Sequence, residues 1–318
     1  MKQPSWAALL GRQARLLQRA ARPLRERHRP PPGAGSWLTG AVLTEAGPRR
    51  YGLFRPEGVR FGERLPLLVM LHGCHQDARS FAASTRMNAV AARERFLVLY
   101  PEQPRLANAQ GCWNWFELQS GRAQAEAAWI LRAIDQVAML YAADRERVAV
   151  AGLSAGASMA ALLATRHPQR FKALVMHSGV PPGAAQSPAT AVGAMRGRRL
   201  PAAVAEAGQD WPPLLVIHGE ADGVVSASNA GAAVRLWSQA AGARASAPQS
   251  QQRGRRYPMT VTQFKRARRV VATLVQVGGL GHAWSGGAAR QRFSDAQGPD
   301  ASRMVWRFAA RQFGRDPA

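Results

Sequence analysis

The segment that most constrains the fold is residues 148–156, with the sequence Val-Ala-Val-Ala-Gly-Leu-Ser-Ala-Gly. A short apolar run leads into Gly-x-Ser-x-Gly, and a stretch of small, helix-compatible residues follows. This order predicts a tight turn from a buried strand into a helix, in which Ser154 takes strained backbone angles. Gly152 and Gly156 flank it because side chains there would collide with neighbouring elements. Such a turn exposes the hydroxyl, so Ser154 is the candidate nucleophile.

The rest of the chain alternates between strand-like and helix-like segments. Apolar runs typical of buried parallel strands occur at 67–71, 96–100, 148–151, 174–176, 214–217 and 270–277, and the clearest helical stretches are 123–141 and 155–166. The alternation predicts an α/β fold with one mostly parallel, doubly wound sheet flanked by helices. One catalytic domain over 36–318 accounts for it, and whether the segments 180–212 and 243–256 flank the active site stays open.

The net charge of +24 is concentrated in two segments, 1–35 and 243–269, which together carry +15. This distribution is typical of an enzyme with two basic segments, and nucleic acid is not expected as a partner. From Leu9 to Leu24, apolar residues and arginines occupy opposite faces of a predicted helix, and a Pro-rich linker follows. We predict that residues 1–35 form a tail, either loosely attached or docked on a polymer granule or membrane surface.

A serine nucleophile needs a histidine base, and the base needs an orienting acid. In hydrolases with this strand–turn–helix motif, the acid and then the histidine follow the serine along the chain. His282 lies in a glycine-rich loop after the last strand run and is the predicted base. Asp222 follows another strand run and is the predicted acid, with Glu220 as its rival and helix capping as its alternative role. His177 and His218 are interpreted as core or loop histidines.

Acyl transfer also needs N–H donors for the oxyanion of the tetrahedral intermediate. The run at 67–71 leads into His72-Gly73-Cys74, the strand-to-helix loop that supplies one such donor, and the residue after the nucleophile supplies another. We therefore predict an oxyanion hole made of the backbone N–H groups of Cys74 and Ala155. Cys74 is interpreted as a backbone donor rather than as a second nucleophile.

Four motifs in this order resemble those of the polyhydroxybutyrate (PHB) depolymerase family of esterases. They are His72-Gly73-Cys74-x-Gln76, the stretch from Gly111 to Phe116, Gly152-Leu153-Ser154-Ala155-Gly156, and the stretch from Gly281 to Gly287, and the resemblance covers roughly residues 40 to 313. It implies an α/β-hydrolase fold that requires neither a cofactor nor a metal ion. It also implies hydrolysis of short-chain polyhydroxyalkanoate esters, or of feruloyl and acetyl esters on plant polysaccharides.

The same resemblance suggests roles for tryptophans and cysteines. It places Trp113 and Trp115 near the substrate cleft, where they and Trp284 would pack on an acyl chain or ring. Core filling is the alternative for Trp113 and Trp115. Both cysteines, Cys74 and Cys112, lie in family motifs, so a disulfide between them is expected in an oxidising compartment.

The sequence leaves alternatives open for both the cellular compartment and the function. Members of the family are often secreted, whereas arginines interrupt the N-terminal segment where a cleavable signal peptide needs an apolar core. Both an extracellular and a cytoplasmic location therefore stay open. A peptidase or thioesterase would use the same three residues. A non-catalytic protein that binds nucleic acid or an anionic surface is the alternative from a different class.

Overall fold

The structure, a computed structural model, describes residues 31–199, 201 and 210–314. The chain divides into two compact units, residues 1–31 and 32–318, and the description below concerns the second unit. The predicted amphipathic segment from Leu9 to Leu24 lies outside the described residues, as does part of the segment 180–212. The predicted boundary between residues 35 and 36 stays a prediction.

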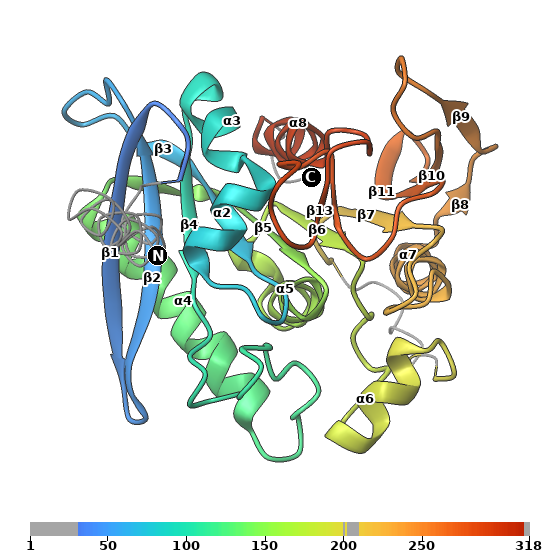
Figure 1. Cartoon of the computed structure of the whole chain (residues 1–318), viewed down its shortest axis with the longest axis horizontal. Coiled ribbons are helices and arrows are strands. Elements are labelled where there is room, and N and C mark those ends of the chain that lie inside the picture. Colours follow the sequence, from blue (N-terminus) through green and yellow to red (C-terminus); the bar gives the residue numbers. More distant parts are fainter. Residues whose placement is uncertain (1–30, 200, 202–209, 315–318) are drawn as a thin grey trace, which may run out of the picture. The chain divides into compact units, whose positions relative to one another are not determined.

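Within the described residues, one sheet of eleven strands has the order β1-β2-β4-β3-β5-β6-β7-β11-β10-β8, with β9 paired to β10 (Figure 1). The strands are β1 (Gly35–Thr44), β2 (Gly47–Pro56), β3 (Leu65–Leu71), β4 (Leu97–Pro101), β5 (Ala143–Leu153), β6 (Ala173–His177), β7 (Leu214–Gly219), β8 (Arg244–Ala245), β9 (Gln249–Gln251), β10 (Met259–Arg266) and β11 (Arg269–Val277). From β4 to β11 all neighbours are parallel, and the strands at both ends are antiparallel. The six predicted strand runs correspond to β3, β4, β5, β6, β7 and β11.

These central strands are continuously apolar because both of their faces are covered. Successive side chains alternate between two core layers: Leu67 and Val69 enter one layer, whereas Leu68 and Met70 enter the other. Helices α4 (Arg122–Leu140), α5 (Ala155–Arg166) and α7 (Ser228–Ala241) pack against the first face. Helices α2 (Ala78–Thr85), α3 (Met87–Glu94) and α8 (Ala301–Phe313) pack against the second. The predicted α/β class is therefore confirmed.

Four short elements remain among the described residues. They are α6 (Pro188–Met195), the 3-10 helix η1 (Pro168–Arg170), and the strands β12 (Trp284–Ser285) and β13 (Ser294–Asp295), which pair with each other. The predicted helices 123–141 and 155–166 correspond to α4 and α5. In the part of the chain that is described, none of the helices combines the length and apolar character that crossing a bilayer requires.

Candidate active site

Ser154 lies in the sharp turn between β5 and α5, with φ 56° and ψ −121°. For a residue with a side chain this backbone region costs about 1–3 kcal/mol, so the surrounding structure must hold it. A Cβ on Gly152 would come within 2.3 Å of the Gly156 carbonyl carbon, and one on Gly156 within 2.1 Å of the Leu71 oxygen. The amide of Ser154 donates to the His177 carbonyl at 2.9 Å. The turn is thus fixed by close backbone packing, and the Ser154 side chain is half-buried.

Asp222 and His282 lie in the loops that follow β7 and β11, two adjacent parallel strands. The Nδ1 atom of His282 lies 2.8 Å from Oδ2 of Asp222, and the Asp222 side chain is excluded from solvent. Because a carboxylate only accepts hydrogen bonds, Nδ1 carries the proton and Nε2 is the nitrogen left to act as a base. Ser154 also follows a parallel strand of this sheet, so all three residues lie at its carboxyl edge.

Hydrogen bonds saturate the Asp222 carboxylate. Its Oδ1 accepts the backbone amides of Val224 and Val225 in the same loop, each at 2.9 Å. The helix cap considered as its alternative role is not seen, because the N-cap of α7 is Ala227. His218 Nε2 lies 3.4 Å from Oδ2 and 2.9 Å from the Val225 carbonyl. Burial acts to raise the pKa of Asp222, but the hydrogen bonds from His218 and His282 outweigh it and hold the pKa well below its usual range. The rival acid Glu220 is exposed.

His177 supports the His282 loop from within the core. It is fully buried, its Nε2 accepts the amide of Ser285 at 3.1 Å, and its ring stacks on Trp284 with centroids 5.0 Å apart. Burial, followed by repulsion from His218 and His282, lowers the pKa of His177 to about 3. It is therefore neutral at physiological pH. The interpretation of His177 as a core histidine agrees with this position, whereas His218 contacts the acid, which sequence reasoning did not anticipate.

The two predicted oxyanion donors have free N–H groups. Ala155 is the first residue of α5, where an N–H has no acceptor within the helix. Among the described residues, neither its amide nor that of Cys74 donates a hydrogen bond. An N–H at a helix N-terminus is suited to an oxyanion, which becomes its hydrogen-bond partner during the reaction.

The loop that carries Cys74 is tied to residues 108–116. A disulfide joins Cys74 to Cys112, the His75 amide donates to the Gln110 carbonyl at 2.7 Å, and Trp113 Nε1 donates to the His72 carbonyl at 3.0 Å. These three links hold the Cys74 amide in place.

A buried carboxyl group organises the same region. Glu126 accepts the Asn114 amide at 2.8 Å and its side-chain amide at 2.6 Å, and it also accepts the side chain of Gln103. The Gln103 amide in turn donates to His72 Nε2 at 3.1 Å. Burial raises the pKa of Glu126, although the hydrogen bonds from Asn114 and Gln103 oppose this shift. Sequence reasoning missed this network; the signal was an acid within an otherwise apolar helix face.

A cavity of about 210 Å³ opens beside Ser154. It contains no charged residue, and its lining is Cys74, Asn108, Gln110, Cys112, Trp115, Phe116, Ser154, Ala155, Ser158, Val180, Pro188, Ala191, Val192, Met195 and Val225. Residues from α6 close one side, so the segment 180–212 does flank this site, whereas no residue of 243–256 reaches it.

Only one of the three predicted substrate tryptophans lines this cavity, and that is Trp115. The prediction is wrong for Trp113 and Trp284, whose side chains are fully buried. Trp284 donates its indole N–H to Ser302 Oγ at 3.0 Å and packs edge-on against Phe81. Trp113 donates to a backbone carbonyl and stacks on Trp129. Both indoles fill the core because their only polar atom finds a partner there.

No group of three or more His, Cys, Asp or Glu side chains in the described ranges is arranged to hold a metal ion.

Residues 49–249 match the model of the family described as "Esterase PHB depolymerase". The chain belongs to this family. A curated relative, poly(3-hydroxyalkanoate) depolymerase C of Paucimonas lemoignei, is 34% identical over 175 residues, which are 52% of this chain and 42% of the relative. Feruloyl esterase B of Neurospora crassa is 27% identical over 55% of this chain and 65% of its own length. The chain thus spans less than two thirds of the length of these relatives.

Solved structures share the fold at lower identity. An acetyl xylan esterase from Aspergillus awamori superposes with a TM-score of 0.63 at 19% identity, over 77% of this chain and 94% of that one. An S-formylglutathione hydrolase from Agrobacterium tumefaciens gives 0.55 at 15% identity, over 89% and 97%. The fold is the α/β-hydrolase fold, as the family resemblance implied.

Proposed function

We propose that this protein is a serine esterase that uses Ser154, His282 and Asp222. The hydrogen bond between Asp222 and His282 at the carboxyl edge of the sheet, where Ser154 also lies, is the observation that carries the proposal. Ser154 Oγ attacks the ester carbonyl while His282 Nε2 takes its proton and then returns it to the leaving alcohol. Asp222 stabilises the resulting imidazolium. Water then hydrolyses the acyl-enzyme by the same route, with the amides of Cys74 and Ala155 binding the oxyanion.

The cavity beside Ser154 favours a short, uncharged acyl group. Its side chains are mostly apolar, and Met195, Val192 and Phe116 are among them. A short-chain polyhydroxyalkanoate has such a group at every ester bond. Because a relative is a polyhydroxyalkanoate depolymerase as well, this polymer is the first candidate substrate. Feruloyl and acetyl esters on plant polysaccharide are the second candidate, because a relative is a feruloyl esterase and Trp115 and Phe116 present aromatic surface to the cavity.

Substrate comparison separates these two candidates. We would measure hydrolysis of p-nitrophenyl acetate, butyrate and octanoate, release of ferulate from methyl ferulate, release of acetate from acetylated xylan, and clearing of a short-chain PHB suspension. Clearing that requires Ser154 supports the depolymerase proposal. Ser154-dependent release of ferulate or of acetate from xylan, without clearing, would instead assign a polysaccharide esterase.

Granule or membrane contact through Leu9 to Leu24 is a separate proposal that rests on the sequence pattern alone. Deleting residues 1–31 leaves β1, which begins at Gly35, intact. The deletion should reduce clearing of polymer particles and leave hydrolysis of soluble esters unchanged. An equal loss of both activities would refute the docking proposal.

A further inference from the structure

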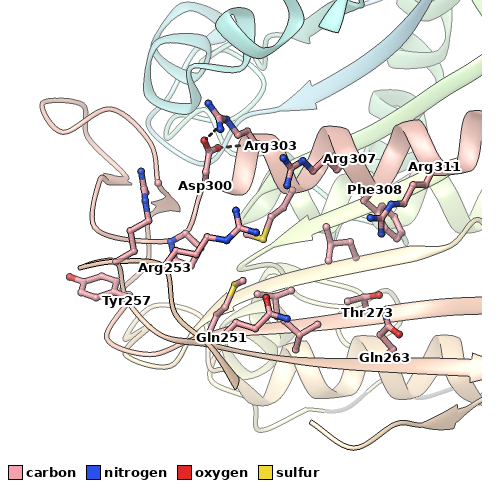
Figure 2. A pocket seen from close by; sticks show the side chains of 18 of the residues that line it. Gln251, Arg253, Tyr257, Gln263, Thr273, Asp300, Arg303, Arg307, Phe308 and Arg311 are labelled. Atoms are coloured by element: carbon pink, nitrogen blue, oxygen red, sulfur yellow. Dashed lines mark hydrogen bonds and ion pairs between the residues drawn. The ribbon is translucent and has the colours of Figure 1, made fainter. Parts of the chain in front are cut away.

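A second, larger cavity of about 570 Å³ is shown in Figure 2, and it lies on the other face of the sheet from the Ser154 cavity. It is bordered by α8, the strands β7, β9, β10 and β11, and the loops that carry Arg253 and Asp300. Leu215 and Val275 point into it from the core layer on the α8 side, whereas Ala155 and Val180 of the Ser154 cavity belong to the opposite layer. The two cavities share no lining residue. We call the second one the arginine cavity.

Six arginines and a single acid, Asp300, line the arginine cavity; the arginines are Arg86, Arg253, Arg256, Arg303, Arg307 and Arg311. Arg303 pairs with Asp300 at 3.2 Å, and Arg256 Nη1 donates to the Gly298 carbonyl at 2.5 Å. Within the ranges that the structure describes, the side chains of the other four form no ion pair. The cavity therefore concentrates positive charge, and most of it has no acidic counter-ion among the described residues.

All six arginines are exposed, so solvent screens much of their mutual repulsion, and the part that remains favours a bound anion. Arg303, Arg307 and Arg311 recur every four residues along α8, and Figure 2 shows Arg303 turned toward Asp300 while Arg311 lies above the strands that carry Thr273 and Gln263. Like charges at this spacing destabilise a helix by about 0.2–0.5 kcal/mol per pair. Arg253 comes from a loop about fifty residues earlier in the chain and borders the same space. An acidic group bound among them would relieve the repulsion and accept charge-assisted hydrogen bonds.

Part of the lining of the arginine cavity is apolar. Met259 and Val261 project from β10 at alternate positions, and Met304 and Phe308 project from α8 beside the arginines. All four side chains are only half-buried, so they present apolar surface to the space. A small inorganic anion would leave that surface uncovered, whereas an aliphatic chain would bury it at about 25 cal/mol per Å².

We propose that the arginine cavity binds an anionic amphiphile, a carboxylate or phosphate group carried on an aliphatic chain. The chain lies over Met259, Val261 and Phe308, and the acidic group lies between Arg307, Arg311 and Arg253. A volume of about 570 Å³ is in the range of pockets that enclose small organic ligands. Single-stranded nucleic acid is a poorer match, because it is bound along extended basic grooves with stacking aromatic side chains, and the apolar part of this half-open cavity is mainly aliphatic. The proposal does not depend on the esterase activity.

The test is calorimetric titration of the full chain with octanoate and octyl phosphate, each below its micelle concentration. Acetate and inorganic phosphate serve as anions without a chain, and octyltrimethylammonium as a chain without an acid. The variant Arg307→Gln/Arg311→Gln removes two cations from the cavity. Arg132→Gln/Arg268→Gln is the matched control, because both of its arginines are exposed and lie outside the cavity.

We expect octanoate and octyl phosphate to bind at least tenfold more tightly than acetate and inorganic phosphate. The variant Arg307→Gln/Arg311→Gln should lose at least tenfold in affinity for the two anionic amphiphiles, while the control variant should keep the wild-type affinity. Unchanged hydrolysis of p-nitrophenyl butyrate would show that the cavity variant is folded. Equal binding of acetate and octanoate, or an equal loss in both variants, would overturn the proposal. Binding to vesicles that contain phosphatidylglycerol then identifies the source of the amphiphile. Vesicle binding that requires Arg307 and Arg311 assigns a membrane lipid, whereas binding of the monomeric amphiphiles without vesicle binding assigns a free acid. Vesicle binding without binding of the monomeric amphiphiles would refute the cavity as the site.

Discussion

The disulfide between Cys74 and Cys112 allows a quantitative prediction about stability. It links residues 38 positions apart. A cross-link over about 38 residues removes roughly 13 cal/mol/K of entropy from the unfolded chain, which is about 4 kcal/mol at 25 °C. Residues 32–318 have an unfolding entropy of roughly 600 cal/mol/K at about 2.1 cal/mol/K per residue. Cys74→Ala/Cys112→Ala should therefore lower Tm by about 6 °C.

The same change should also reduce activity, because Cys74 supplies a proposed oxyanion donor. Loss of a complete donor costs about 10²–10³ in kcat. Here the bonds from His75 to Gln110 and from Trp113 to His72 still hold the loop, so we expect a smaller loss of about tenfold.

Differential scanning calorimetry and p-nitrophenyl butyrate kinetics, with and without a phosphine reductant, measure both effects. The reductant should lower Tm and kcat of the wild type and leave the double variant unchanged. A wild type that contains two titratable thiols before reduction, or a double variant with the Tm of the oxidised wild type, would refute this reasoning.

Three further substitutions test the site. Asp222→Asn removes the charge that stabilises the His282 imidazolium and should lower kcat by about 10⁴-fold, whereas Glu220→Gln should leave kcat nearly unchanged; similar losses in both would refute the assignment of the acid. Gly156→Ala drives a Cβ against the Leu71 carbonyl at 2.1 Å and should cost at least about 3 kcal/mol in urea unfolding, while Gly314→Ala, which meets no atom within 4 Å, should cost under about 1 kcal/mol. His177 has a folded-state pKa of about 3 against 6.5 for its ordinary value, so the unfolded chain binds more protons between these limits and stability falls as pH decreases from about 6.5 to 3. His177→Gln should reduce the slope of unfolding free energy against pH in that window by up to about 1.4 kcal/mol per pH unit, and an unchanged slope would contradict the buried neutral state.

The central strands and the nucleophile turn were predictable from sequence because local pattern and tertiary environment agree there. Strands such as Leu65–Leu71 are buried on both faces, so each is one continuous apolar run. The sheet margins were not predicted, since β1 and β10 are half-exposed and their apolar residues form no such run. The strands β8 and β9 in the basic segment 243–256 were also not predicted. They form by pairing with β10 and not by burial of apolar residues.

Contacts between distant residues account for what the sequence could not supply at the site. The Asp222 and His282 loops were identifiable because each follows a buried strand, but the approach of His218 to Asp222 depends on how the loop after β7 folds back. The family resemblance suggested a place in the cleft for Trp284; in the structure its indole lies in the core against His177. Neither the fold of the loop after β7 nor the direction of the Trp284 side chain can be predicted from the neighbouring sequence.

The most direct test of the proposed mechanism is the steady-state hydrolysis of p-nitrophenyl butyrate by the wild type and by Ser154→Ala, with Ser158→Ala as the control. Ser158 also lines the cavity, but it lies within α5 and not in the strand-to-helix turn, and its hydroxyl accepts the Val180 amide at 2.9 Å. We predict that Ser154→Ala lowers kcat by at least about 10⁴-fold, while Ser158→Ala retains activity within about tenfold. Ester hydrolysis that persists in Ser154→Ala at the wild-type rate would contradict the assignment of Ser154 as the nucleophile.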